Sequence, residues 1–517
     1  MKIGFTTIYS FRPHVEQMFF LSKLLTDAGH ESAFMVCNSA VDACYAQLLK
    51  GTTRLTECPK CILGNFRTYP VRDIWSIDGK VKAELTDSEL KELAASSSYT
   101  LLRIETPEEA RSEELTAIQR RLHGPIGIVL ENTRQWIRRQ GLDAVICFNG
   151  RIDLTRAVIR ACEDVGIPYI TCERSLYGHG LHLVPNANCL SLRELDRLAT
   201  LYRDAPLTLA QARHAAKLAA ARFLNKDVLE YRLYNPNPRA AAWPREGVQE
   251  KVLIVPSSRN EFMGHPDYTC DWQDNTQALE TLMASLGIHP DQCVLRCHPN
   301  WAEPIGVNTG ARIEMHYRQW GARSGVLCIA SRDKASTNDL INQANLVVVN
   351  GSSCGYEAGI CGKKVVCLGP SAYQQAGFAI HIRRDEEWLR LQALEQHDPE
   401  TTVRRSLRYI YLRAHRLPQY VDYVRAQSTT KFHYYKGADP NRLIRMLETG
   451  VVDPDDPVVA DTTAGEDEVL ESVLKQDWAE LYQLEEKPLS LPELKIGRRR
   501  AFRWIDPLRG MFPKGDL

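Results

Sequence analysis

Short apolar segments alternate with amphipathic ones along the first third of the chain. The apolar segments are predicted strands, at Lys2–Ile8, Glu31–Cys37, Ala144–Phe148 and Ile167–Thr171. The segments Glu16–Ala28 and Asp153–Val165 are predicted helices. Strands that alternate with helices in this way indicate a parallel α/β sheet.

Two longer segments have helical patterns. Glu108–Gln140 is predicted to be helical with a break at Gly124-Pro125. Leu192–Leu233 is rich in Ala, Leu and Arg, which predicts a helical insertion or the bridge between two halves. A second α/β unit begins near Lys251 and continues to about Gly369, with helices to about Leu447.

These patterns predict an α/β protein with two Rossmann-like halves facing a central cleft. We expect residues 1–240 to form the first half with its helical insertion, and residues 250–447 to form the second half. Residues 448–517 are predicted to be an acidic linker, with Asp453–Pro457 at its start, followed by a short helix near Leu470–Leu484 and a basic C-terminal tail.

Composition narrows the class of protein. Its 517 residues include 64 Lys and Arg against 64 Asp and Glu, which gives no support for a nucleic-acid partner. The first residues lead directly into a predicted strand rather than a signal peptide, and no apolar run reaches the ~18 residues of a membrane span. The 15 cysteines are scattered, which favours a reducing cytoplasm over a disulfide framework.

Polar motifs follow three predicted strands of the second half. They are Pro256–Glu261 after Lys251–Val255, Arg296–Asn300 after Cys293–Leu295, and Asn350–Gly359 after Leu346–Val349. In an open parallel sheet, ligands bind at the carboxyl ends of the strands. A carboxylate, a histidine with an arginine, and a Gly-Ser turn into a helix together predict a site for an anionic, phosphorylated ligand.

The last two motifs supply the candidate phosphate ligands. Arg296 offers a planar fork of donors, His298 adds another, and Asn300 lies beside them. The alternative for His298 is a hydrogen bond to a backbone carbonyl of its own loop. Ser352 and Ser353 precede a helix start, where free N–H groups bind anions, although serines in this position also act as simple helix caps.

Glu357 lies one turn inside the helix that follows the Gly-Ser turn. We expect it either to contact a ribose or base of the ligand, or to close a capping box near Ser353.

Two further carboxylates are predicted to come from opposite halves of the molecule. Glu261, with Asn260 beside it, follows the first strand of the second half, and Glu173 follows Ile167–Thr171 in the first half. Glycosyl chemistry commonly needs one carboxylate that attacks or deprotonates and another that orients or donates. The alternative is that each carboxylate pairs with an arginine as a surface ion pair.

The motif Asn149-Gly150-Arg151 ends the predicted strand Ala144–Phe148. Gly150 permits close backbone approach and Arg151 suits an anionic acceptor, so Asn149 and Arg151 are candidate acceptor-binding residues. The alternative is an ordinary turn between a strand and a helix.

Four cysteines near the N-terminus, Cys37, Cys44, Cys58 and Cys61, form the pattern C-x6-C-x13-C-x2-C. Only the second pair has the spacing of a zinc knuckle. The set is therefore predicted to be either a structural zinc site or four free thiols.

The C-terminal segment Lys495–Leu517 combines basic residues with Phe502, Trp504 and Phe512. Such a segment is predicted to touch an anionic inner-membrane surface, which makes the protein peripheral on the membrane. The alternative is that the tail folds back on the acidic stretch Asp453–Glu486 or on the body of the protein.

The three strand-end motifs together resemble a known family. The blocks Ser257–Phe262, His298–Asn300 and Gly351–Ala358 are similar to those of bacterial capsule-polysaccharide biosynthesis glycosyltransferases, which include the β-Kdo transferases. The resemblance extends to Lys364–Gly369 with Tyr373, and to Asn149–Arg151 and Glu173, so it covers about residues 140–430.

This resemblance implies a GT-B-like fold, a nucleotide-activated sugar donor and no catalytic metal. It implies that His298, Ser352 and Ser353 hold the nucleotide phosphate, and that Ser336 makes another nucleotide contact. The implied activity is transfer of Kdo or a related ulosonic acid from a CMP-activated donor onto a bacterial surface polysaccharide or lipid-linked acceptor.

Three functions stay open on the sequence. Many relatives have an acidic residue where this chain has Asn260, which leaves Glu261 as the only carboxylate of that motif. Besides the CMP-linked donor, the pattern fits a GT-B enzyme that uses a UDP-sugar or CDP-polyol. It also fits a catalytically inactive assembly protein that kept the nucleotide-binding fold.

Overall fold

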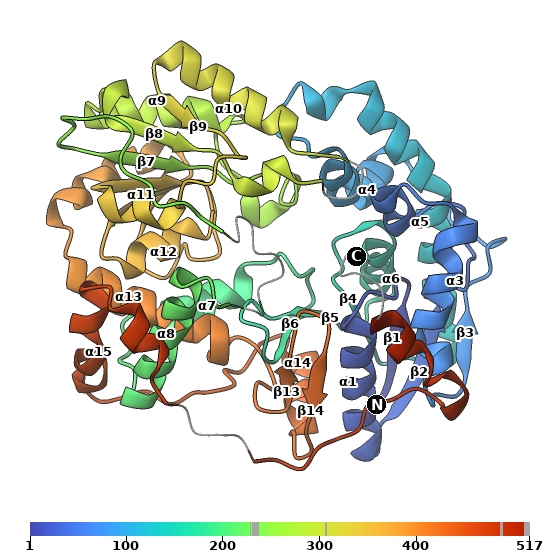
Figure 1. The fold of residues 1–517 in the computed structure, drawn as a ribbon. Helices are drawn as coiled ribbons and strands as arrows, with labels where there is room; N and C mark the ends of the chain where they lie inside the picture. The colour runs from blue at the N-terminus through green and yellow to red at the C-terminus, as the bar shows by residue number, and fades with distance from the viewer. Residues whose placement is uncertain (228, 230–236, 305–307, 486–489, 511–517) are drawn as a thin grey trace.

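The computed structural model describes residues 1–227, 229, 237–304, 308–485 and 490–510. It contains two six-stranded sheets, one in each half of the chain (Figure 1). The first has the order β3-β2-β1-β4-β5-β6. Its strands are β1 (Lys2–Thr7), β2 (Glu31–Val36), β3 (Ile74–Ser76), β4 (Ala144–Phe148), β5 (Tyr169–Arg174) and β6 (Leu181–Pro185), and only β5 and β6 pair antiparallel.

The second sheet is parallel throughout, with the order β12-β11-β10-β7-β8-β9. Its strands are β7 (Val252–Val255), β8 (Cys293–Arg296), β9 (Leu327–Ile329), β10 (Leu346–Val349), β11 (Lys364–Leu368) and β12 (Ile380–Ile382). Counted from β7, this order repeats that of the first sheet and is the Rossmann order. The predicted α/β, GT-B-like fold of two Rossmann-like halves is therefore confirmed.

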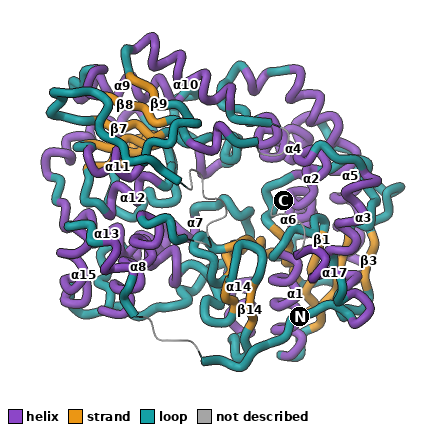
Figure 2. Tube along the Cα trace, in the orientation of Figure 1, coloured by secondary structure: helices purple, strands orange, loops and turns teal. Residues whose placement is uncertain are grey.

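Helices surround both sheets (Figure 2). Those of the first half are α1 (His14–Asp27), α2 (Tyr45–Lys50), α3 (Arg54–Gly64), α4 (Asp87–Leu102), α5 (Glu113–Gln140) and α6 (Asp153–Val165). The predicted break at Gly124-Pro125 is wrong, because α5 runs through both residues. Pro125 and Gly127 are buried, and Gly127 lies so close to the Ala83 carbonyl that a side chain would collide with it. Packing of α5 against its neighbours thus outweighs the lost proline hydrogen bond.

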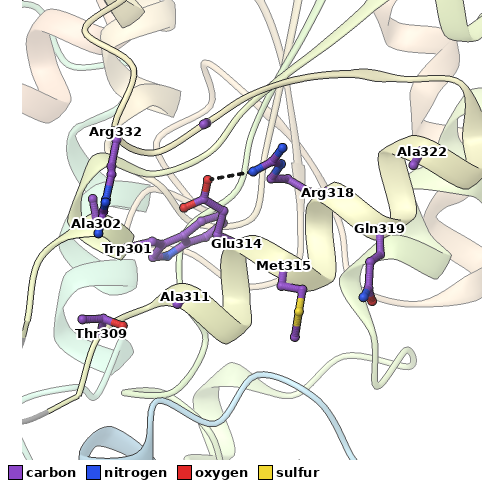
Figure 3. Close-up of a pocket in the computed structure, with 11 residues that line it drawn as sticks. Trp301, Ala302, Thr309, Ala311, Glu314, Met315, Arg318, Gln319, Ala322 and Arg332 are labelled. Carbon is purple, nitrogen blue, oxygen red and sulfur yellow. Dashed lines mark ion pairs between the residues drawn. The ribbon is translucent and has the colours of Figure 1, made fainter.

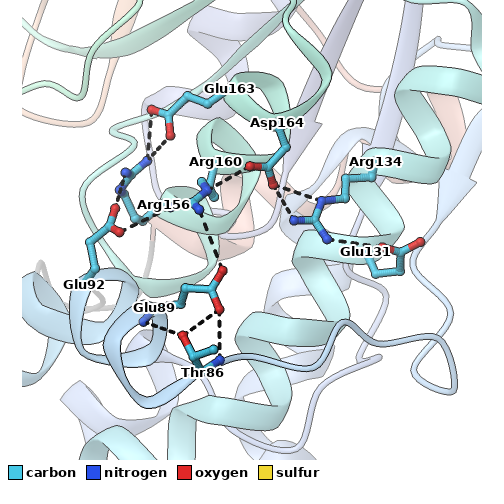
Figure 4. Close-up of polar contacts among 9 residues, drawn as sticks. All are labelled: Thr86, Glu89, Glu92, Glu131, Arg134, Arg156, Arg160, Glu163 and Asp164. Carbon is cyan, nitrogen blue, oxygen red and sulfur yellow. Dashed lines mark hydrogen bonds and ion pairs between the residues drawn. The ribbon is translucent and has the colours of Figure 1, made fainter.

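Charged side chains join the exposed faces of α4, α5 and α6 (Figure 4). Arg134 of α5 pairs with Asp164 of α6, while Arg156 of α6 pairs with Glu92 of α4 at 2.6 Å. These pairs are partly exposed, so each contributes at most about 1 kcal/mol and they serve mainly to align the three helices.

The second half has helices α9 (Asn275–Leu286), α10 (Ala311–Ser324), α11 (Thr337–Gln343), α12 (Cys354–Ile360) and α13 (Pro399–Tyr411). The predicted insertion, Leu192–Leu233, contains the two helices α7 (Arg193–Tyr202) and α8 (Leu209–Phe223). Both helices belong to the hydrophobic core that covers the second sheet, although they precede it in the chain. The segment therefore bridges the halves, as one of the predicted alternatives states.

The chain crosses back to the first half after α13. Tyr420 and Val424 belong to the core of the first half, as do residues of the hairpin strand β14 (Phe432–Tyr434) and of α14 (Pro440–Thr449). The other hairpin strand is β13 (Val424–Ala426). The packing of residues 420–452 therefore crosses the domain boundary that the sequence placed near residue 447.

The acidic segment after α14 is packed rather than loose. The Asp455 carboxylate accepts hydrogen bonds from the Tyr420 and Val421 amides at 3.1 and 3.0 Å. The predicted short helix is a pair, α15 (Ala464–Leu474) and α16 (Trp478–Tyr482), whose apolar residues join the core of the second half. The region predicted as a linker is thus part of both cores.

The basic tail folds back on the first half. Arg498 is buried, donates hydrogen bonds to the Leu63 carbonyl and the Thr68 hydroxyl, and pairs with Asp506 at 2.9 Å. The short helix α17 (Ile505–Gly510) follows, and Trp504 is 54% exposed. The fold-back alternative is confirmed for residues 498–506, while Phe512 lies outside the described residues and membrane contact stays a prediction.

Within the described residues, none of the helices combines the length and the apolar character that crossing a bilayer requires.

Candidate functional site

The loops after β7 and β10 are tied together at the centre of the second sheet. Asn350 accepts a hydrogen bond from the Ser257 amide through Oδ1 (2.6 Å), and its Nδ2 donates one to the Ser257 carbonyl (3.0 Å). The strand order of the sheet reverses between β7 and β10, which is where ligands of such sheets bind. This link therefore fixes the two loops that carry Glu261 and Ser353.

The two candidate serines make different contacts. The Ser352 hydroxyl accepts a hydrogen bond from the Cys354 amide (3.3 Å), and the Ser352 carbonyl accepts one from the Tyr373 hydroxyl (2.8 Å). Ser353 Oγ instead accepts a hydrogen bond from Nη2 of Arg222 (3.1 Å). Ser352 is thus bound into its own turn, whereas Ser353 lies beside a guanidinium.

Arg222 of α8 also pairs with Glu357, a contact that no local sequence pattern indicated. Its Nε donates to the Glu357 carboxylate, whose side chain is 7% exposed. The guanidinium carbon lies 5.6 Å from the centre of the Tyr356 ring. The buried ion pair holds Glu357 in place of the predicted capping box, while contact of Glu357 with a ribose or base stays a prediction.

His298 is a neutral hydrogen-bond donor at this edge of the sheet. Its Nδ1 accepts a hydrogen bond from the Asn300 amide (3.1 Å). Burial, reinforced by the charges of Arg296 and Arg103, lowers the pKa of His298 to about 4. The ring is therefore neutral at pH 7 with its proton on Nε2, which makes Nε2 a donor.

Arg296 and Ser336 support the neighbouring loop. Arg296 is fully buried, and its guanidinium donates to the carbonyls of Cys297, Ala330 and Asp333. The structure thus places this arginine against the backbone of the loop after β9, which differs from the predicted phosphate contact. Ser336 begins α11, where its hydroxyl accepts a hydrogen bond from the Asp339 amide (3.2 Å) as a helix cap.

Two hydrogen-bond donors hold Glu173 of the first half, and His14 lies beside it. Glu173 Oε2 accepts a hydrogen bond from Asn149 Nδ2 (2.9 Å), and its Oε1 lies 3.3 Å from His14 Nε2 and accepts the Arg174 amide (2.9 Å). Asn149 adopts a φ of +60°, uncommon for a residue other than glycine. Burial lowers the pKa of His14, so its ring is neutral beside Glu173, a neighbour that sequence reasoning missed.

Arg151 lies between the carboxylates of the two halves. Its Nη1 donates to Ser96 Oγ (2.7 Å) and Thr100 Oγ1 (3.2 Å) of α4. Burial lowers the pKa of the Arg151 guanidinium, but the negative charges around it, with Glu261 first and Glu173 among them, outweigh burial and hold the pKa above its usual value. Arg151 therefore lies within electrostatic reach of Glu261 in the second half and of Glu173 in the first half.

Glu261 forms neither a hydrogen bond nor an ion pair with any residue that the structure describes. Burial raises the pKa of Tyr45 in the first half to about 12. The charge of Arg151 opposes this shift, and the charge of Glu261 adds to it. Glu261 is thus close enough to Tyr45 and Arg151 of the first half to influence their pKa values, and it has no surface ion-pair partner among the described residues. The adjacent Asn260 is 4% exposed.

A turn of the first half contacts both ligand-site loops of the second half. Arg103 ends α4 with a φ of +54° and donates to the carbonyls of Asn300 (3.4 Å) and Glu303 (3.2 Å). Glu105 accepts a hydrogen bond from the Arg259 amide (3.0 Å), two residues before Glu261. Residues 103–105 therefore position the His298 and Glu261 loops, which no local sequence pattern indicated.

Glu105 should make stability depend on pH. Burial raises its pKa to about 7, so the folded protein keeps a proton that the unfolded chain releases near pH 4.5. Stability should therefore fall as pH rises from about 4.5 to 7, by on the order of 3 kcal/mol for this group. The free energy of unfolding of wild type and of Glu105→Gln can be measured by chemical denaturation at pH 5 and at pH 8. At pH 8 the variant should be more stable than wild type, because glutamine stays uncharged. An equal effect at both pH values would contradict the raised pKa.

The four N-terminal cysteines are free thiols in this structure. Burial raises the pKa of Cys61 to about 11 and also raises the pKa of Cys37 and Cys44. Among the described residues, no group of three or more His, Cys, Asp or Glu side chains is arranged to hold a metal ion. The arrangement thus gives the zinc alternative no support.

A cavity of about 640 Å³ opens beside α10 (Figure 3). Trp301 and Ala302 line it from the loop after β8, Arg332 from the loop after β9, and Glu314 and Arg318 from α10. None of the predicted site residues lines this cavity, so it is separate from the groups around Arg151.

No family model matches the chain, and no curated protein matches it. Its fold is similar to two solved structures from Thermosulfurimonas dismutans. One is KpsC, beta Kdo 2,4 transferase, at 15% identity over 65% of this chain and 88% of that chain, with a TM-score of 0.34. The other is KpsC, beta Kdo 2,7 transferase, at 14% identity over 67% and 89%, with a TM-score of 0.33.

A third similar structure is SsfS6, a glycosyltransferase from Streptomyces sp. SF2575. It is 14% identical over 80% of this chain and 95% of that chain, with a TM-score of 0.22. At these identities and TM-scores, the likenesses assign no function to this chain.

Proposed function

We propose that the protein is a glycosyltransferase that transfers a sugar from a nucleotide-activated donor. The observation that carries this proposal concerns two carboxylates from opposite halves, Glu261 and Glu173. The negative charges of both raise the pKa of the same arginine, Arg151. Paired carboxylates across a reacting centre are the groups that glycosyl chemistry uses.

The second half supplies the donor side of the proposed reaction. His298, neutral and protonated on Nε2, donates a hydrogen bond to the donor phosphate, and Ser353 with Arg222 provides further donors beside it. A neutral histidine binds phosphate without a change in protonation near pH 7. The proposal includes no catalytic metal.

The first half supplies the acceptor side. Glu173 is held by Asn149 and the Arg174 amide, with His14 beside it, which suits a carboxylate that orients reacting groups. Glu261 has no such restraint among the described residues, which suits the carboxylate that attacks or removes a proton. Arg151 completes the site as a cation for an anionic acceptor.

We propose Kdo or a related ulosonic acid, linked to CMP, as the donor sugar. The resemblance of the strand-end motifs to those of the β-Kdo transferases is the basis for this choice, and a UDP-sugar or a CDP-polyol is the alternative donor. The inactive assembly protein is less well supported, because Asn260 is buried while the neighbouring Glu261 is partly exposed and close to Tyr45 of the first half. The proposed acceptor is a surface polysaccharide or a lipid-linked sugar, which the basic tail would meet at a membrane.

Donor hydrolysis by the purified protein tests this function. Release of CMP from a CMP-linked ulosonic acid supports the proposal, while release of another nucleotide from a UDP-sugar or CDP-polyol panel moves it to the other donor class. Binding of every donor without turnover would favour the assembly protein.

The variant His298→Ala should bind CMP about 10- to 100-fold more weakly, because a hydrogen bond to a charged phosphate is lost. Isothermal titration calorimetry measures this loss. The matched control is His289→Ala, since His289 also precedes a proline and accepts a hydrogen bond from an amide two residues later (3.4 Å), but is exposed. Equal CMP affinity in both variants would exclude His298 from the phosphate site.

A further inference from the structure

Arg413 is a cation near the place where the two halves meet. It has no role in the proposed reaction. Helix α13 continues into one π-helical turn, Leu412–Arg416, just before the chain crosses to the first half. π-helical turns are rare in proteins, and those that occur are often found at functional sites. Arg413 lies in this turn and is partly exposed.

Arg413 has one hydrogen-bond partner among the residues that the structure describes. Its Nη1 donates to the Tyr409 hydroxyl (3.0 Å), and its guanidinium carbon lies 5.9 Å from the centre of the Tyr409 ring. No carboxylate of the described chain lies within ion-pair distance, in contrast to the neighbouring Arg408, which pairs with Glu466. Arg413 is only partly exposed and has no ion-pair partner among the described residues, so an anionic ligand would supply the missing counter-charge.

On one side, Arg413 adjoins the phosphate residues of the second half. The Tyr409 ring lies 6.0 Å from the Tyr356 ring, and Arg222 lies over Tyr356. The two arginines therefore stand over neighbouring tyrosines. Arg222 is the one whose Nη2 donates to Ser353, so Arg413 lies one aromatic pair away from the proposed phosphate site.

On the other side, Arg413 adjoins Glu173 of the first half through a histidine. Burial lowers the pKa of His182 to about 4, and the positive charge of Arg413 is the second cause. The negative charge of Glu173 opposes the shift. His182 pairs directly with Glu173 in the antiparallel register of β5 and β6. Beside Glu173 in the sheet there is thus a neutral imidazole on which the Arg413 charge also acts.

Residues of both halves complete the surroundings. Burial raises the pKa of Tyr177, in the first half, and of Tyr268, in the second half, and the charge of Arg413 opposes both shifts. Tyr268 also stacks on Phe262 at 4.3 Å, and Phe262 follows Glu261 directly. The Arg413 charge therefore acts on tyrosines of both halves, one of which stacks on the residue after Glu261.

We propose that Arg413 binds a second anionic group of the donor, next to the bond that is broken. This inference rests on the proposed function, because it places the group between the phosphate residues and Glu173. A guanidinium presents a planar fork that matches a carboxylate or a phosphate. Two donor classes supply such a group: the carboxylate of an ulosonic acid, or the second phosphate of a nucleoside diphosphate sugar.

The test is the variant Arg413→Met, titrated with CMP, with CDP and with a CMP-linked ulosonic acid. We expect CMP to bind wild type and variant equally, and one of the other two ligands to bind the variant about 10- to 100-fold more weakly. A loss confined to the CMP-linked acid assigns the carboxylate, and a loss confined to CDP assigns the second phosphate. Arg413→Lys, which keeps the charge but not the fork, should show a smaller loss.

The matched control is Arg139→Met, because Arg139 also lies over an aromatic ring, Trp75 at 5.8 Å, but is exposed on α5. If the methionine variant does not fold, the lysine variant carries the test alone. Equal affinities for all three ligands in wild type and in the Arg413 variants would overturn the subsite and leave the proposed function standing. A wild-type protein that binds none of the three ligands would overturn both the subsite and the CMP-linked donor of the proposed function.

Discussion

The variant Glu261→Gln should lose sugar transfer by about 10²- to 10⁴-fold while it still binds the donor. Glutamine keeps the shape of the side chain, but it neither removes a proton nor attacks a sugar carbon. Glu261 has no hydrogen-bond or ion-pair partner among the described residues, so the exchange should leave stability nearly unchanged. Nucleotide release under saturating donor measures the rate, and calorimetry measures donor affinity.

Two companion variants make this result specific. Glu173→Gln should also lose transfer with donor binding intact, because the amide nitrogen cannot accept a hydrogen bond, so Asn149 and the Arg174 amide can no longer both donate to this side chain. Glu471→Gln, which changes an exposed glutamate of α15, should retain full activity. Wild-type turnover in both Glu261→Gln and Glu173→Gln would show that these carboxylates are not the reacting pair.

The variant Arg408→Met should destabilise the second half by about 3–5 kcal/mol, the usual result of leaving one member of a buried pair behind. Arg408 donates to both oxygens of Glu466, from Nε at 2.7 Å and from Nη2 at 2.8 Å, and Glu466 is fully buried. The Leu207 amide also donates to Glu466. The pair therefore joins α13, α15 and the start of α8.

Chemical denaturation followed by tryptophan fluorescence measures this loss. Trp478 of α16 stacks on Phe223 of α8 at 4.4 Å and reports on the contact between the C-terminal helices and the second half. The double variant Arg408→Met with Glu466→Leu should recover most of the stability, since no buried charge is left. Lys475→Met, which removes an exposed pair on α15, should unfold like wild type. An unchanged midpoint in Arg408→Met would mean that the acidic segment lies outside the core.

Local patterns predicted the elements whose partners are close in sequence. The bounds of β4, β10 and α6 agree with the prediction, because an apolar run or a helical repeat is complete within each segment. The candidate loops were placed at one edge of the second sheet for a similar reason, since parallel strands end at a common edge. The sequence did not indicate that α5 continues through Pro125, because burial against other helices keeps it intact.

The site shows the same division. The identity of Glu261, Glu173, His298 and Ser353 as candidates follows from motifs within a few residues of a strand end. The partners of these residues do not follow from local motifs. Arg222 and Ser353 are hydrogen-bonded although they lie 131 positions apart in the sequence, and the charge that raises the pKa of Arg151 most comes from Glu261 in the other half. Arg296 illustrates the converse, since a strand-end arginine has the same local pattern whether it faces a phosphate or three backbone carbonyls.

The sequence by itself determined two Rossmann-like sheets and the edge of the second sheet at which polar residues gather. Hydrophobic periodicity and the residue types at strand ends are local features of the sequence, so they can be recognised without knowledge of the fold. Only the tertiary structure decided which cations face which carboxylates, that Arg103 and Glu105 brace the loops of the opposite half, and that the acidic segment and the basic tail are packed. Those contacts join residues far apart in the chain, and docking of whole helices and sheets selects them.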